Sequence, residues 1–161
     1  TDISSEHFWG DKCKEKITYI RNYTFNSVNT LKIDPMMPYI DGTKKEYSNY
    51  WFSSSDGHTI SEFNSLLNKN NIDKLESEGG ACLVYTHLAS GFFKRDGIIN
   101  EEFKRNIKYL SSKNGWFVPA STLLDYLKSH RKNAHVSQKY LARLDLIWVV
   151  DRIGKKIRFE R

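Results

Sequence analysis

Residues 79–87 read GGACLVYTH, and this stretch decides the fold that the sequence predicts. Two glycines indicate a loop, and residues 81–85 follow without a charge or an alternating polar side chain. A short apolar run of this kind is typical of a strand that is covered on both faces, as parallel strands of α/β proteins are. The sequence therefore predicts a buried parallel strand over residues 81–85.

His87 stands where this predicted strand ends. Ligands of α/β folds bind at the carboxyl ends of parallel strands, and an imidazole can exchange protons near neutral pH. His87 is therefore the candidate catalytic residue. In the alternative interpretation, His87 caps the strand by hydrogen-bonding to loop backbone, and position alone leaves both interpretations open.

Helical patterns flank the strand. Thr59 and Glu62 form a capping box that predicts a helix start, and residues 71–78 predict a second helical stretch that Gly79 ends. Further along we expect a helix capped by Asn100, a strand over residues 116–118, a helix from Ser121, and a last helix from Ser137 that ends at Gly154. Alternating helices and strands predict an α/β fold with parallel strands joined by right-handed crossovers.

The sequence before residue 59 predicts strands and irregular structure instead of helices. Residues 16–25 predict a strand and residues 27–33 a possible second one, whereas residues 34–57 predict a long irregular stretch. Tyr50 and Trp51 lie in that stretch among short polar side chains, a composition that suits stacking on sugar rings. The alternative is that these aromatics pack onto the core.

Composition restricts the classes of function. The 161 residues suffice for one domain with a hydrophobic core, and no apolar run reaches the roughly 20 residues of a membrane span. The net charge of +6 is scattered and lacks interleaved aromatics, so we do not expect nucleic-acid binding. Cys13 and Cys82 do not form a disulfide framework, and their pairing stays open.

Few residues have a pattern typical of catalysis or metal binding. The sequence has no phosphate-binding loop, nucleophile elbow or CxxC pair. Asp56 and His58 could join His87 in a zinc site, but their spacing fits no zinc signature, and Asp56 with Gly57 also suits an ordinary turn. We therefore assign no metal ligand from the sequence.

Two segments carry a family resemblance. Residues 80–88, GACLVYTHL, resemble the last motif of the polysaccharide deacetylase family, the NodB-homology carbohydrate esterases of family 4. Residues 115–127, GWFVPASTLLDYL, look like the closing strand and helix of that family. The resemblance covers the chain from about residue 50 to about residue 130 and implies part of a deformed (β/α) barrel.

The resemblance implies a hydrolase that removes acetyl groups from N-acetylated sugars of a carbohydrate polymer. His87 takes the position of the general acid, and Tyr50, Trp51 and Tyr85 are the expected substrate-binding residues. The family uses a divalent, zinc-like metal held by one Asp and two His, and it implies an extracellular or cell-envelope location.

The chain departs from the family in its metal-binding motifs. It has no Asp-Asp motif and no two histidines spaced as His-x-x-x-His, and the segment Met37-Pro38-Tyr39 lacks the arginine of the third motif. A full barrel needs roughly 200 residues or more. We therefore expect residues 1–161 to be one domain, the C-terminal portion of a larger barrel that does not catalyse deacetylation unaided, completed by a missing N-terminal half or another chain.

Two alternatives stay open beside this hypothesis. The chain could be a non-catalytic carbohydrate-binding domain that uses the aromatic residues near Trp51. It could also be a structural α/β domain whose functional site lies on another chain, with a large apolar surface of its own.

Overall fold

The fold is built on a parallel sheet. A computed structural model describes residues 4–132 and 134–159, and its central sheet has the strand order β1-β3-β4, with β1 at Tyr19–Phe25, β3 at Tyr50–Asp56 and β4 at Val84–Tyr85. Both pairings are parallel, as is the small sheet of β2 (Ile40–Asp41) and β5 (His135–Val136). The predicted α/β class with parallel strands is confirmed, and the described strands form no closed barrel.

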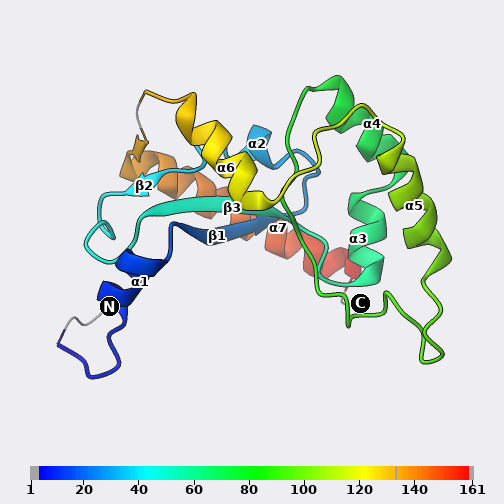
Figure 1. Ribbon diagram of the computed structural model, residues 1–161, viewed down its shortest axis with the longest axis horizontal. Coiled ribbons are helices and arrows are strands. Elements are labelled where there is room, and N and C mark those ends of the chain that lie inside the picture. The colour runs from blue at the N-terminus through cyan, green and yellow to red at the C-terminus, as the bar shows by residue number, and fades with distance from the viewer. Residues whose placement is uncertain (1–3, 133, 160–161) are drawn as a thin grey trace.

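Helices alternate with these strands and cover them. They are α1 (Gly10–Lys16), α2 (Thr30–Ile33), α3 (Ile60–Leu66), α4 (Lys69–Ser77), α5 (Glu101–Ser111), α6 (Ala120–Ser129) and α7 (Gln138–Phe159). In Figure 1, α6 lies in front of the β1–β3 pair and α7 behind it, while α3, α4 and α5 gather at one end. No helix among the described residues is long and apolar enough to cross a membrane.

Apolar side chains form two core clusters. One joins the sheet to α6 and α7 through Phe25, Tyr39, Leu83, Leu124 and Leu144, all buried. The other lies among α3, α4 and α5 and contains Phe63, Leu66, Ile72 and Phe92. Together they fix the carboxyl ends of β3 and β4 between the two groups of helices.

Several predicted boundaries are confirmed because local interactions set them. The Thr59–Glu62 capping box begins α3, and the Asn100 side chain accepts a hydrogen bond from the Phe103 amide to begin α5. Gly79 follows α4 with a φ of 56°, a left-handed conformation that favours glycine.

Other predictions are wrong. Residues 27–33 form no strand and instead contain the short helix α2 at Thr30–Ile33, which the Asn29 side chain begins by accepting a hydrogen bond from the Lys32 amide. Residues 34–57 are not irregular throughout, since they contain β2 and the central strand β3. The buried Ser53 and Ser55 give β3 a polar sequence, but their hydroxyls donate to Asp34 (2.6 Å) and to the Ser27 carbonyl (2.6 Å).

Two further predicted strands and one predicted helix also differ from the structure. The strand predicted over residues 81–85 is limited to the two residues of β4. Residues 116–118 form no strand, because no neighbouring described strand pairs with them, and the Trp116 and Phe117 side chains are each 58% exposed. Helix α7 continues through Gly154 to Phe159, since contacts beyond Gly154 hold it against the sheet.

Candidate functional site

The carboxyl ends of β3 and β4 lie side by side. The Gly57 amide donates to the Tyr85 carbonyl (2.9 Å), and the His87 amide donates to the His58 carbonyl (3.2 Å). The two chain segments that follow these strands are therefore joined, and His58 comes beside His87. This is the place that strand topology favours for a ligand.

Four side chains stack at this end of the sheet. The His58 and His87 rings are nearly parallel, with centroids 5.7 Å apart and planes at 14°, and the other neighbour of His58 is Tyr85 at 5.6 Å and 29°. The Arg21 guanidinium lies 3.8 Å from the centroid of the Tyr85 ring. We call Arg21, Tyr85, His58 and His87 the ring column.

His87 is exposed and lies at one end of the column, with His58 as its ring neighbour. Its Nδ1 lies 3.2 Å from the Ser90 hydroxyl, and the Ser90 amide donates to the His87 carbonyl at 2.8 Å. The neighbouring Thr86 hydroxyl is buried without a hydrogen-bond partner in the structure. An exposed imidazole fixed in this way can transfer a proton to or from a group bound over the strand ends.

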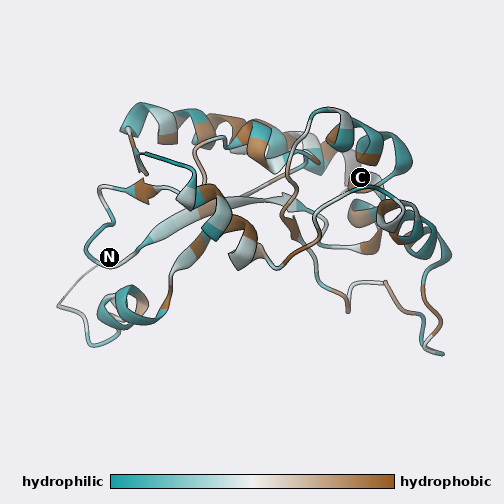
Figure 2. Ribbon diagram, turned by 45° about the horizontal axis from the view of Figure 1, so that its top comes forward, coloured by the Kyte–Doolittle hydropathy of each residue, from teal (hydrophilic) through white to brown (hydrophobic). Residues whose placement is uncertain are grey.

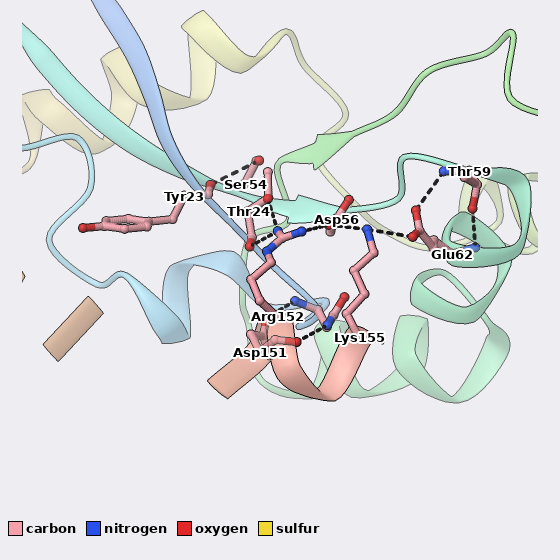
Figure 3. Close-up of polar contacts among 10 residues, drawn as sticks. Tyr23, Thr24, Ser54, Asp56, Thr59, Glu62, Asp151, Arg152 and Lys155 are labelled. Carbon is pink, nitrogen blue, oxygen red and sulfur yellow. Dashed lines mark hydrogen bonds and ion pairs between the residues drawn. The ribbon is translucent and has the colours of Figure 1, made fainter. Parts of the chain in front are cut away.

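A buried ionic network lies at the end of β3 (Figure 3). The Asp56 carboxylate is 3.1 Å from the Arg152 guanidinium and 3.0 Å from the Lys155 ammonium, both on α7. Lys155 also contacts Glu62 at 2.7 Å, and Glu62 accepts the Thr59 amide in the capping box. We call Asp56, Glu62, Arg152 and Lys155 the Asp56 network.

The network compensates the buried charges at the strand end. Burial by itself lowers the pKa of Lys155, but hydrogen bonds to Glu62 and Asp56 and their negative charges outweigh it, so the pKa lies above its ordinary value. Both carboxylates therefore face a permanent cation. The described residues place no carboxylate in hydrogen-bond contact with His87.

The residues present do not fit the divalent metal that the resemblance implies. No three His, Cys, Asp or Glu side chains among the described residues are grouped so as to hold an ion. Asp56, the carboxylate closest in sequence to His58, is already held in two ion pairs with α7.

The structure brings only one of the predicted substrate-binding residues into the ring column, where it stacks on His58. Tyr85 belongs to the ring column, whereas Tyr50 and Trp51 begin β3, whose seven residues place them about 20 Å from its other end. The Trp51 indole donates to the Ser48 hydroxyl (3.0 Å), and the Lys44 ammonium lies over its ring. The role of these two residues in sugar binding stays a prediction.

Sequence reasoning missed the residues that reach the site from a distance. Arg21 lies within β1, and Arg152 and Lys155 are on α7, about a hundred residues from Asp56. No spacing or motif marks these three cations. The capping box did single out Glu62, but only as a helix signal.

An apolar cavity of about 410 Å³ lies away from His87, at the amino end of β4. Its walls include Leu75 of α4, Leu110 of α5 and the exposed Trp116. Cys82 lines it, and burial raises the pKa of this thiol to about 11, which leaves it protonated and weakly nucleophilic near neutral pH. Cys13 and Cys82 are both free thiols.

Comparison with known proteins gives no relative: no family model, no curated protein and no solved structure matches this chain.

Proposed function

We propose that this chain is a polysaccharide deacetylase-like domain, part of a deformed (β/α) barrel that hydrolyses N-acetyl groups of a carbohydrate polymer when complete. His87 is the general acid of this proposal, and Tyr85 contacts the substrate. The metal that such a reaction uses would be held by residues outside this chain.

One observation carries the proposal. A parallel sheet ends in an exposed histidine that is fixed by a ring and a hydroxyl, at the edge where α/β folds bind ligands. The open sheet order β1-β3-β4 also agrees with part of a larger barrel. Because fold alone does not decide function, the residue-level arrangement around His87 is the stronger support.

The proposed chemistry needs a proton at one defined atom. Hydrolysis of an acetamide breaks the bond between the carbonyl carbon and nitrogen, and water supplies the oxygen of the acetate. The leaving nitrogen must gain a proton to depart as an amine. His87 donates that proton in its imidazolium form, as a general acid does.

The test is an assay of acetate release from an N-acetylglucosamine oligomer by the longest natural form of the protein, with a divalent cation supplied. We expect His87→Ala to lower the rate by about 10²–10⁴-fold, the usual contribution of a general acid. His130→Ala is the matched control, because His130 is also exposed and packs against a ring, that of Tyr126, but it belongs to the C-terminal end of α6 and not to the ring column. A loss below about threefold for His87→Ala would exclude the assignment.

A non-catalytic carbohydrate-binding or structural role is the second candidate. The structural role is favoured by the apolar side chains that α7 leaves uncovered: Leu146, Val150 and Ile153 are each more than half exposed, and Figure 2 shows hydrophobic positions along this helix. The carbohydrate-binding role predicts that the chain alone binds the same oligomer without a metal, and that Trp51→Ala removes binding while the fold is retained. Unchanged binding by Trp51→Ala would count against the aromatic residues as the sugar site.

A further inference from the structure

We propose that His58 is the positioning residue of His87: it holds the imidazole of His87 by ring stacking from one side and by a backbone hydrogen bond. The inference rests on the proposed function only where it predicts that substitutions at His58 slow acetate release. The positioning itself is a property of this chain that can be measured without a substrate.

Two independent contacts connect His58 to His87. The rings are 5.7 Å apart at an angle of 14°, so one face of the His87 imidazole lies over His58. The His58 carbonyl also accepts the His87 amide at 3.2 Å, which ties the backbone of one strand end to that of the other. Rotation of the His87 ring away from this position would lose the stacking contact.

His58 can hold another ring because it is itself fixed. Tyr85 stacks on it from the other side, and Arg21 lies over Tyr85, so His58 is an inner member of the column. The backbone before it is closely packed, since a Cβ at Gly57 would lie 3.2 Å from the Phe63 ring and 3.3 Å from the Val84 side chain. His58 therefore offers His87 a rigid surface.

The same geometry selects the nitrogen that transfers the proton. The Ser90 hydroxyl engages Nδ1 of His87, and the Ser90 carbonyl accepts the Ile60 amide (3.0 Å), which anchors this turn to the start of α3. With Nδ1 engaged and one ring face on His58, Nε2 is the nitrogen left for the leaving amine. Small displacements of a catalytic group have large effects on rate, so loss of this support is expected to slow the reaction.

The experiment compares two substitutions at one position. His58→Ala removes the stacking surface, whereas His58→Phe restores a ring and removes both nitrogens. In the chain alone, we measure the ring-proton resonances of His87 by NMR at one fixed pH, with His130→Ala as the control and thermal unfolding as the check on folding. In the longest natural form, we measure kcat and KM for acetate release from the N-acetylglucosamine oligomer.

We expect His58→Ala to shift the His87 ring resonances and lower kcat by about 10–100-fold while KM changes little, and His58→Phe to retain kcat within about threefold. A His87 resonance that is the same in the native chain and in folded His58→Ala overturns the proposal. Equal losses of kcat in the Ala and Phe variants also overturn it, because stacking would then not be what His58 provides.

The two hypotheses can fail separately. If the His87 resonances shift in His58→Ala and return in His58→Phe, the positioning role is supported even when no form of the protein releases acetate. That result would reject the proposed deacetylase function alone.

Discussion

Asp56 is almost wholly buried at the end of β3, and a carboxylate in that place is stable only with compensating charges. Arg152 and Lys155 supply two cations from α7, and Lys155 adds a third contact, to Glu62. These side chains connect the central strand, the start of α3 and the last helix. A single lysine thus joins three elements at the strand end.

Replacing that lysine by methionine tests the network. We expect Lys155→Met to lower the free energy of unfolding by about 2–4 kcal/mol, because it leaves Asp56 with one cation and Glu62 with none. The measurement is urea unfolding followed by circular dichroism.

Lys156→Met is the matched control for this change. Lys156 is the next residue on the same helix but is exposed, so its replacement should stay within about 0.5 kcal/mol of the native chain. Equal losses in the two variants would mean that the Asp56 network contributes little to stability.

At the scale of an element, α7 shows how tertiary contacts override a local signal. Glycine is a poor helix former, and the sequence predicts that Gly154 ends the helix. Two residues that flank Gly154 in the helix, Arg152 and Lys155, form ion pairs with Asp56. These ion pairs stabilise the helical conformation on both sides of the glycine, so α7 continues to Phe159.

Gly154→Ala should therefore stabilise the protein by about 0.5–1 kcal/mol, because a Cβ at Gly154 meets no atom within 4 Å and alanine lowers the entropic cost of the helix. Gly79→Ala is the control with the opposite sign. Its Cβ also meets nothing, but its φ of 56° would cost alanine about 1–2 kcal/mol. Urea unfolding of both variants measures the difference, and a shift of the same sign in each would contradict this explanation.

The elements that the sequence predicted correctly depend on neighbours in the chain. The Thr59–Glu62 capping box and the Asn100 cap are formed within three residues, and the left-handed Gly79 is a property of one residue. The sequence also placed His87 at a strand end. These features need no knowledge of distant contacts.

The elements that the sequence did not predict depend on contacts between residues far apart in the chain. Strand β3 is recognisable only once Asp34 and Ser27 are known to satisfy its buried serine hydroxyls. Trp116 belongs to a run with the composition of a strand, yet a strand exists only beside a partner strand, and the described part of the chain provides none there. Arg21 reaches the ring column across β3 from β1, which no local pattern reveals.

Across the whole molecule, tyrosine hydroxyls connect α7 to the rest of the fold. Tyr140 of α7 donates to the buried Asp34 at 2.6 Å, and Tyr23 of β1 donates to Asp145 of α7 at 2.6 Å. The hydroxyl of Tyr39, which is wholly buried, accepts from the Asn22 amide group. Burial raises the pKa of all three phenols.

These shifts predict alkaline sensitivity. Above a pH of about 10 the unfolded chain releases phenolic protons that the folded chain retains, so the folded state binds more protons and stability falls as pH rises. The raised pKa of Lys155 acts in the same direction: its stabilisation is complete below the ordinary lysine pKa and is lost as the pH rises through the higher pKa of the folded state.

The measurement is the free energy of unfolding as a function of pH from about 9 to about 11. Tyr39→Phe removes one of these phenolic protons. The free energy of unfolding should then fall less steeply with pH, by up to about 1.4 kcal/mol per pH unit. Tyr126→Phe, the same substitution at an exposed position on α6, is the control. Parallel curves for native protein and Tyr39→Phe would contradict the assignment.

The distance in sequence between Asp56 and Lys155 also has a consequence for biosynthesis. While the chain is being translated, β3 emerges from the ribosome about a hundred residues before the lysine that neutralises its terminal carboxylate. Until then Asp56 has no cation from α7, and because an uncompensated carboxylate is costly to bury, we expect the end of β3 and the following His58 to stay hydrated in the nascent chain. Assembly of the site is thus coupled to synthesis of the last helix, and a ribosome that pauses before residue 152 should hold this region in an open, protease-sensitive state.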